Sequence, residues 1–174
     1  MVITVGDKKI GPNLPCFIIA EAGVNHNGDI NLAKQLIIEA AKAPVLAYGE
    51  KDWNAVKASV APDVLHDEVA THRKTRGVDQ LITCWKGWGT AFPDSKATFR
   101  KAFFSGTTVV LELTWRGTHR GPLDMPGGSV PATGKSIELP ACLIVEIEGG
   151  KAKSMRHYFD MATILQQLGI AKAA

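Results

Sequence analysis

The strongest constraint on the fold of this 174-residue chain is a series of β-strand patterns in its C-terminal half. Within residues 107–119, large apolar side chains occupy every second position at Val109, Leu111, Leu113 and Trp115, and residues 135–147 are almost continuously apolar. The pair Gly149-Gly150 then leads into another strand pattern, which is typical of a β-hairpin. Long strands joined in this way favour an antiparallel sheet. The predicted strands are residues 97–104, 107–119, 135–147 and 151–159.

Helical patterns precede these strands. The first begins at Asp29, a residue type that favours the N-cap, and we expect Pro44 to kink or end it. A second pattern is broken at Gly49 and ends at Pro62. Helices followed by a run of long strands are typical of an α+β domain with segregated elements. The remaining predicted elements are a short strand at residues 64–70 and helices at residues 78–92 and 161–168.

The composition is that of an ordinary globular protein. Hydrophobic residues make up 45% of the chain and charged residues 21%, which excludes a disordered tail. The net charge is only +3, and Lys and Arg are scattered along the sequence. The nearest approach to a basic cluster, residues 72–76, is interpreted as a solvated loop. We therefore expect no nucleic-acid partner.

The cysteines and the apolar runs bear on the compartment. The three cysteines are far apart and have no metal-ligand spacing, so each is interpreted as a small buried hydrophobe in a reducing compartment. Lys8 and Lys9 precede an apolar run at residues 17–20 that is too short for a signal peptide. No apolar run has the length of a transmembrane helix. We expect a cytoplasmic protein with no membrane partner.

Residues 1–43 have the pattern of one βα unit. The string CFIIAEAGVNHNGD, followed by LAKQLI, resembles the opening of the N-acetylneuraminate (sialic acid) synthase family. The resemblance implies the first strand and helix of a (β/α)₈ barrel, with Glu21, Asn25 and His26 facing substrate. Such a barrel needs about 250 residues, and the resemblance ends after Ala43. We therefore expect this segment to be a non-catalytic N-terminal extension.

Residues 44–174 resemble the SnoaL-like polyketide cyclases of the nuclear-transport-factor-2-like superfamily. The resemblance implies a cone-shaped, cystatin-like α+β fold, in which a curved antiparallel sheet wraps around helices and often pairs into a homodimer through the sheet. The expected organisation is therefore an extension at 1–43 and a SnoaL-like domain at 44–174. The motifs that carry the resemblance are APDVLH (61–66), WKGWGTAFPD (85–94), WRGTH (115–119), GPLDMP (121–126), PATGK (131–135), GGK (149–151), RHYFD (156–160) and LQQLG (165–169).

The same resemblance implies where the site lies. In the polyketide cyclases an aspartate on the last strand acts as the acid/base, and His157 occupies that position here. The neighbouring polar positions of the family fall on Met155, Ala141 and Leu143. The family's carboxylate is therefore absent from this strand. Trp85, Trp88, Trp115 and Phe159 are expected to complete the pocket wall.

His157 is the predicted general base, because an imidazole with an ordinary pKa near 6.5 can take a proton at neutral pH. Strand alternation places it on one face with Met155 and Phe159, and places His66 and Glu68 on one side of their own strand. These three polar residues form a predicted proton relay. The alternative for His157 is a core residue that is hydrogen-bonded to a neighbour.

No cofactor or metal is expected. No Gly-x-Gly-x-x-Gly motif follows a strand, and the loop at residues 121–126 does not have the composition of a phosphate-binding loop. A zinc site built from His66, His72 and His157 has no support from the spacing of these residues.

Three functions follow from this reasoning. The first is a lyase or isomerase of the cyclase type that acts on a small apolar carbonyl compound, with His157 as the base. The second is a non-catalytic pocket for an apolar small molecule, because Ala141, Leu143, Met155 and Phe159 form a dry wall. The third is a dimeric interaction module that uses the sheet as its interface.

Overall fold

The computed structural model describes residues 3–5, 8–10, 29–125 and 128–170. Its helices are α1 (Ile30–Gly49), α2 (Trp53–Ser59), α3 (Val78–Ala91) and α4 (Met161–Leu168), with a 3-10 turn at Val69–Thr71. Its strands are β1 (Ile3–Val5), β2 (Lys8–Ile10), β3 (Val60–Glu68), β4 (Arg73–Arg76), β5 (Lys96–Ser105), β6 (Thr108–Thr118), β7 (Leu123–Met125), β8 (Gly128–Val130), β9 (Ser136–Glu148) and β10 (Lys151–Phe159). The predicted strand at 16–20, with Glu21, Asn25 and His26, lies outside the described residues.

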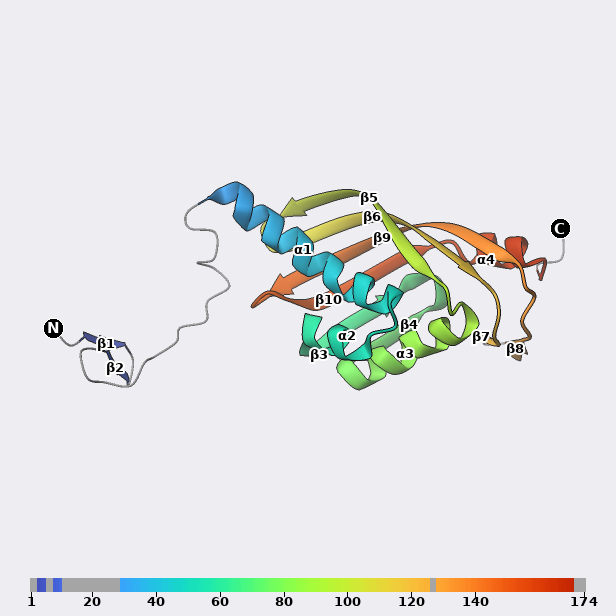
Figure 1. Cartoon of the computed structure of the whole chain (residues 1–174), viewed down its shortest axis with the longest axis horizontal. Coiled ribbons are helices and arrows are strands. Elements are labelled where there is room, and N and C mark those ends of the chain that lie inside the picture. The colour runs from blue at the N-terminus through green and yellow to red at the C-terminus, as the bar shows by residue number, and fades with distance from the viewer. Residues whose placement is uncertain (1–2, 6–7, 11–28, 126–127, 171–174) are drawn as a thin grey trace.

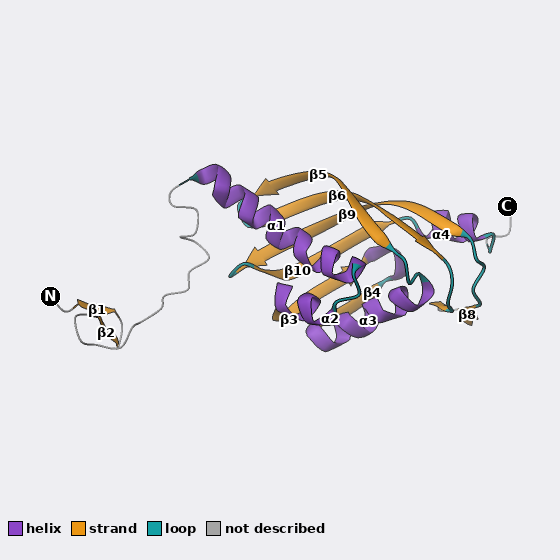
Figure 2. Ribbon diagram, viewed as in Figure 1, coloured by secondary structure: helices purple, strands orange, loops and turns teal. Residues whose placement is uncertain are grey.

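A curved six-stranded sheet forms the body of the protein, with the strand order β4-β3-β10-β9-β6-β5. Figure 1 shows α1, α2 and α3 on one face of this sheet, and Figure 2 shows how far the strands extend beside them. All neighbouring strands in it are antiparallel except β3 and β10, which are parallel. The predicted α+β class with a curved sheet around helices is confirmed.

The hairpin between β9 and β10 forms as the sequence predicts. Gly149 and Gly150 both have positive φ angles, 55° and 73°, which glycine adopts without steric cost and which suit a two-residue hairpin turn. A bulge between Ala152 and Ser154 then shifts the register of β10. At the bulge Ala152 is buried and Lys153 binds Asp63. From Met155 onward the side chains of β10 alternate between the two faces of the sheet as predicted.

The hydrophobic core lies between the helices and the concave face of the sheet. Leu111 and Leu113 of β6 and Val145 of β9 are fully buried against residues from α1 and α3. Burying a side chain of this size contributes roughly 1.5–3 kcal/mol. A second cluster joins the end of α3 to α4, with Phe92 and Ile164 at its centre. The two clusters hold the helices at a fixed distance from the sheet.

Helix α1 runs through Pro44, where the sequence analysis places a kink or an end. Proline lacks the backbone N–H and costs about 3 kcal/mol in a helix interior. Here Ala41 and Val45 are both buried in the main core, so packing on either side of Pro44 offsets that cost. The predicted boundary between residues 43 and 44 therefore falls inside one continuous helix.

The segment between α1 and α3 differs from the prediction. Helix α2 ends at Ser59, and β3 begins at Val60 rather than at residue 64. Residues 73–76, interpreted above as a loop, form the edge strand β4 paired with β3. Pro62 fits because β3 has its β4 partner only from Leu65 onward, so the missing N–H of Pro62 breaks no bond with that neighbour.

Removing residues 1–28 is expected to leave a cooperatively folded protein, with the free energy of unfolding changed by less than about 1 kcal/mol. The reason is that the six-stranded sheet and both apolar clusters are built from residues after 28. Urea unfolding followed by circular dichroism measures this. Removal of residues 1–48 is the matched comparison, because it deletes the buried Ala41, Val45 and Tyr48 and is expected to abolish the transition. Loss of the cooperative transition in the shorter truncation would contradict the prediction.

Candidate functional site

An apolar cavity with a polar end lies between the helices and the concave face of the sheet. Its volume is about 70 Å³, several times the space that a single water molecule needs. Its polar lining includes His66, Glu68 and His157, and most of the remaining wall is apolar or aromatic. The side chains that line it are Val45, Tyr48, His66, Glu68, Trp85, Trp88, Phe92, Ser95, Trp115, Arg116, Ile137, Leu139, Leu143, His157, Phe159 and Ile164.

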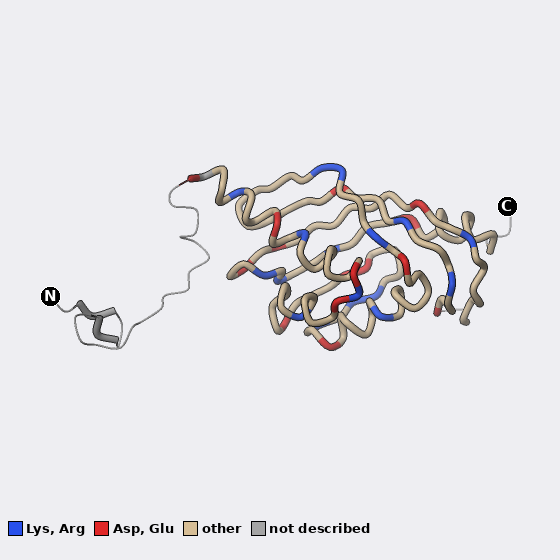
Figure 3. The backbone as a smooth tube through the Cα atoms, in the orientation of Figure 1, with Lys and Arg blue, Asp and Glu red and all other residues tan. Residues whose placement is uncertain are grey.

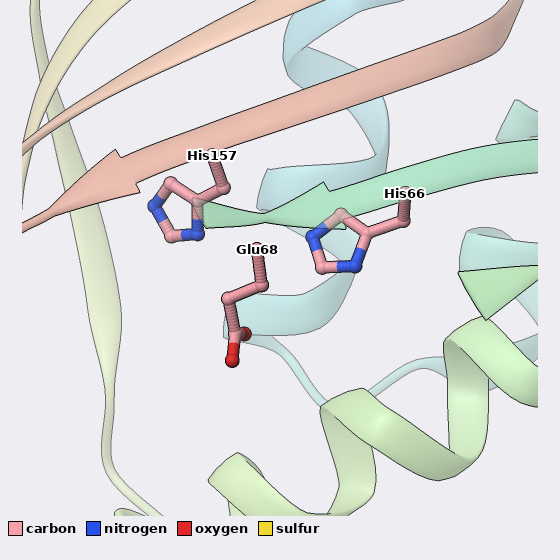
Figure 4. Close-up of side chains that lie close together, drawn as sticks. All are labelled: His66, Glu68 and His157. Atoms are coloured by element: carbon pink, nitrogen blue, oxygen red, sulfur yellow. The ribbon is translucent and has the colours of Figure 1, made fainter. Parts of the chain in front are cut away.

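Three polar side chains converge in this cavity because of the parallel pairing of β3 with β10. The register sets His157 directly beside Glu68. His66 lies two residues before Glu68 on β3, so its side chain projects from the same face of the sheet. One nitrogen or oxygen atom from each of the three residues lies within 4.8 Å of the others. Figure 4 shows the two imidazoles and the carboxylate grouped in this way.

The Glu68 carboxylate is only 2% exposed and is held by neighbouring donors. The indole Nε1–H of Trp88 donates to Oε2 at 2.8 Å, and the hydroxyl of Thr71 donates to Oε1. The Arg73 guanidinium lies 3.7 Å from the same Oε1. A carboxylate is tolerated in such a buried position when partners replace its water. These partners also fix its position beside His157.

His157 makes one hydrogen bond that determines its tautomer. The indole Nε1–H of Trp115 lies 3.2 Å from His157 Nε2. Because an indole nitrogen is only a donor, Nε2 accepts, and the neutral ring carries its hydrogen on Nδ1. The imidazole ring borders the cavity and is therefore partly exposed, although protein atoms pack around the rest of it. Burial, aided by the nearby His66, lowers the pKa of His157 to about 3, so the ring is neutral at physiological pH.

His66 is buried without a hydrogen-bond partner. Its side chain is 2% exposed, and neither of its ring nitrogens has a partner among the described residues. The ring of Trp85 packs edge-on against it at a centroid distance of 5.9 Å. Burial lowers the pKa of His66 to about 4. A polar group that lacks a partner in the core is costly, so this imidazole is available to a polar atom inside the cavity.

The ligand types in this cluster are those of two-histidine-one-carboxylate metal centres. A metal-bound imidazole normally donates its second N–H to an acceptor in the surrounding shell. If His157 bound an ion through Nδ1, its Nε2–H would face the N–H of Trp115, which is a donor. His66 likewise has no acceptor for its second nitrogen among the described residues. The surrounding shell therefore suits neutral imidazoles better than metal ligands.

The structure brings together most of the residues that the sequence predicts for the site. His157, His66 and Glu68 share the cavity, and Trp85, Trp88, Trp115, Leu143 and Phe159 line it. Met155 and Ala141 do not. Met155 is fully buried in the main core, two residues before His157 on β10. Ala141 packs against that core, and its side chain is only a methyl group. His119 is fully buried and hydrogen-bonded to Thr133, outside the cavity lining.

Three polar residues of the cavity lining, Tyr48, Ser95 and Arg116, have no counterpart among the predicted site residues. Tyr48 comes from the last turn of α1, and Ser95 from the loop before β5. Their hydroxyl oxygens lie 3.0 Å apart. Burial raises the pKa of Tyr48 to about 12, so the phenol keeps its proton across the physiological range. The signal for Tyr48 was the helical spacing of residues 45–48, which indicates a buried face but not a pocket.

The fold and the cavity define a nuclear-transport-factor-2-like α+β protein, in which a curved sheet and its helices enclose the cavity. Residues 39–168 match the SnoaL-like polyketide cyclase family, and the chain belongs to this family. The match begins inside the segment that we assigned to the N-terminal extension. It includes the last eleven residues of α1, among them Tyr48.

Solved structures support the fold. TsrD of Streptomyces laurentii superimposes with a TM-score of 0.67 at 22% identity, covering 79% of this chain and 98% of that one. AclR of Streptomyces galilaeus superimposes with a TM-score of 0.66 at 20% identity, covering 79% and 87%. At these identities the similarity concerns the fold alone.

The N-terminal resemblance is also found among curated proteins. N,N'-diacetyllegionaminic acid synthase of Legionella pneumophila is 58% identical over 38 residues, which are 22% of this chain and 11% of the synthase. The chain spans only 10–15% of the length of the curated relatives it matches. In the described part of the chain, no helix combines the length and apolar character needed to cross a membrane. Figure 3 shows Lys and Arg interspersed with Asp and Glu along the described backbone.

Proposed function

We propose that this protein is an enzyme of the cyclase or isomerase type that moves a proton on a small apolar carbonyl compound. The observation that carries the proposal is the convergence of Glu68, His66 and His157 in a mostly apolar cavity. A site that combines a carboxylate, neutral hydrogen-bond donors and a dry wall is suited to proton abstraction next to a carbonyl group. Membership of a polyketide cyclase family supports the same reaction class.

The reaction begins when a base removes a proton from the carbon next to the carbonyl group. The C–H electron pair moves into the carbon–carbon bond, and the carbonyl oxygen becomes an enolate oxyanion. The enolate carbon then attacks a second carbonyl group, which closes a ring, or takes a proton back at another position, which gives an isomer. The base returns its proton in the last step, so the reaction needs no oxidant or cofactor.

The hydrogen-bond pattern favours Glu68 as the base and His157 as a donor to the carbonyl oxygen. In the sequence-based hypothesis His157 is the base. The only lone pair on its neutral ring is at Nε2, which Trp115 occupies, and a pKa of about 3 makes this nitrogen a weak base. Its Nδ1–H has no acceptor among the described residues and is free to donate. Glu68, the register partner of His157, would supply the carboxylate that the last strand lacks.

The lining supports a particular class of substrate. Leu139, Leu143 and Phe159 form an apolar wall, so the body of the substrate should be apolar. A cavity volume of about 70 Å³ favours a small substrate. His66, whose nitrogens have no partner among the described residues, would bind a second polar atom of the substrate. Small ketones with a second carbonyl group meet all of these conditions.

Hydrogen exchange tests the proposal without knowledge of the natural product. A panel of small apolar ketones and 1,3-diketones is incubated with the protein in D₂O, and loss of the α-proton signal is followed by nuclear magnetic resonance. We expect at least one compound to exchange faster than in buffer and in saturable fashion. Saturable binding with no accelerated exchange in any compound would favour a non-catalytic apolar-ligand pocket instead.

A further inference from the structure

A chain of hydrogen bonds leads from outside the cavity to its wall. The Lys51 ammonium group donates to the Ser95 hydroxyl oxygen at 3.0 Å and to the Ser95 carbonyl oxygen at 3.3 Å. The Ser95 hydroxyl in turn lies 3.0 Å from the Tyr48 hydroxyl. Tyr48 and Ser95 line the cavity, whereas Lys51 approaches Ser95 from behind it. The chain therefore connects a cationic group to a phenol that borders the cavity.

The groups involved fix the direction of the first bond, whereas either hydroxyl can donate in the second. Lys51 can only donate, so the oxygen of Ser95 accepts from it. The hydroxyl hydrogen of Ser95 is then free to point at the Tyr48 oxygen. The relay requires this direction, because Tyr48 then keeps its own hydrogen for an acceptor inside the cavity. Successive hydrogen bonds of one direction polarise one another, so the positive charge strengthens Tyr48 as a donor.

Packing fixes each member of the chain. The ring of Tyr48 packs edge-on against three indole rings. The centroid distances are 6.2 Å to Trp53, 5.6 Å to Trp85 and 5.3 Å to Trp115. The Lys51 ammonium lies 3.9 Å from the centre of the Tyr48 ring. Lys51 itself has a φ angle of 57°, a left-handed conformation that few residues other than glycine adopt. Such strain persists only where the surroundings enforce it.

Glycine at position 117 makes room for this arrangement. A Cβ atom at Gly117 on β6 would lie only 3.0 Å from Cα and Cβ of Ser95, so a side chain there would displace Ser95. A Cβ atom at Gly89 on α3 would lie 3.6 Å from Cδ and Cε of Lys51, an ordinary van der Waals contact, so α3 packs directly against the lysine side chain. The backbone of two neighbouring elements therefore approaches closely at the residues that relay the charge.

We propose that Tyr48 is a further catalytic residue, whose hydroxyl donates to the carbonyl oxygen of the substrate, and that Lys51 strengthens this donor through Ser95. The inference rests on the proposed function, because it assigns a stabiliser to the enolate formed there. The enolate oxygen would then receive hydrogen bonds from Tyr48 and from His157. Paired donors of this kind lower the energy of an oxyanion most effectively in a cavity from which water is excluded.

The hydrogen-bond relay from Lys51 through Ser95 to Tyr48 depends on pH. Burial lowers the pKa of Lys51 to about 8, which nearby acidic groups partly counteract. The lysine is therefore charged below about pH 8 and neutral above it, so the donor strength of Tyr48 is present at pH 7 and weakened at pH 9.5. Tyr48 itself, with a pKa of about 12, stays protonated throughout this range. The charged groups that act on Lys51 are Asp94, Glu50 and Lys96.

Binding of 4-nitrophenolate tests the proposal, because this planar oxyanion resembles an enolate and needs no turnover. Calorimetry on the full chain gives Kd, and absorbance gives the ionised fraction. Removal of a hydrogen bond to a charged group weakens binding by about tenfold to a hundredfold, which is the effect expected for Tyr48→Phe. Lys51→Met and Ser95→Ala should each weaken binding, and Lys51→Met should add little once Tyr48 is phenylalanine. The wild-type Kd should rise between pH 7 and pH 9.5, and in Tyr48→Phe it should change less.

The exposed residues Tyr158 and Lys101 provide matched controls, and Tyr158→Phe and Lys101→Met should bind like the wild type. Three results would each overturn the relay. The first is equal affinity of Tyr48→Phe and wild type, and the second is additive effects of Tyr48→Phe and Lys51→Met. The third is a wild type that does not bind 4-nitrophenolate. Glu68→Gln separates the two proposals, because it removes a negative charge from the cavity and should therefore bind 4-nitrophenolate at least as tightly as the wild type while it loses ketone exchange. If Tyr48→Phe weakens that binding while no ketone exchanges, the relay stands and the proposed function fails.

Discussion

Replacement of Glu68 by glutamine is expected to lower the rate of proton exchange on a carbonyl substrate by about 10²–10⁴-fold, the usual contribution of a general base. Glutamine has nearly the same shape and keeps an oxygen that can accept the hydrogen bond of Trp88. It loses the negative charge and the ability to take a proton. The measurement is the exchange rate of the most active ketone, at saturating concentration, for wild type and Glu68→Gln.

The control for this substitution is Glu112→Gln on the exposed face of β6, which should leave the rate unchanged. Equal unfolding midpoints of both variants and wild type would show that the loss of rate is chemical. A Glu68→Gln variant that exchanges at the wild-type rate would remove Glu68 from the mechanism. The base would then have to be sought at His157, as the sequence-based hypothesis has it.

Asparagine at position 157 distinguishes the two roles considered for the histidine. Its amide nitrogen can lie near the place of Nδ1 and donate a hydrogen bond, but it cannot take a proton. A donor role therefore predicts that His157→Asn keeps much more activity than His157→Leu. A base role predicts that both substitutions are equally harmful. The comparison uses the same exchange assay and leaves Glu68 in place.

The sequence predicts the four C-terminal strands and several element ends well, because these depend on local chemistry. The turn at Gly149-Gly150 needs positive φ angles that glycine adopts freely. Asp29 and Asp160 cap helices α1 and α4 by accepting backbone N–H bonds, as their positions before the helical patterns indicate. Gly169 ends α4 in a left-handed conformation. None of these features requires knowledge of a distant part of the chain.

The composition of the site depends on contacts between distant segments. Alternation along each strand places His66 with Glu68, and His157 with Phe159, but it does not reveal which strands are neighbours. The parallel register of β3 and β10 brings Glu68 beside His157 across almost 90 residues of sequence. This pairing places the predicted relay residue Glu68 beside the strand that lacks the family's aspartate. The parallel pair is the one departure from the antiparallel sheet that the strand patterns predict.

Tyr48 was missed for a related reason. Pro44 indicates a break, so the residues after it were separated from the helix that begins at Asp29. Packing on both sides of Pro44 keeps α1 intact, and its last turn then carries Tyr48 into the cavity wall. Propensity rules describe an isolated helix, in which the proline would be costly. In the folded protein, burial of neighbouring residues overrides that local preference.

Acid is expected to destabilise the protein, and His66 is expected to account for about 3 kcal/mol of the loss between pH 7 and pH 4. Burial lowers the pKa of His66 from 6.5 to about 4. Between these values the unfolded chain binds a proton at this residue and the folded chain does not, so falling pH favours unfolding. The contribution of His66 is fully present above pH 6.5 and is lost as the pH falls to 4. His157, with its pKa also lowered, adds to the slope.

The variant His66→Leu isolates this effect, because leucine fills a similar volume and does not titrate. Both imidazole nitrogens lack a partner among the described residues, so the substitution breaks no recorded hydrogen bond and should be nearly neutral at pH 7. At pH 4 the variant should exceed the wild type by about 3 kcal/mol in the free energy of unfolding from urea titrations. The exposed His72 has a φ of 56°, which asparagine tolerates, so His72→Asn is the matched control and should follow the wild type. Parallel pH profiles for His66→Leu and wild type would show that His66 is not held neutral in the folded protein, and would leave the cavity without the uncharged imidazole that the proposed chemistry requires.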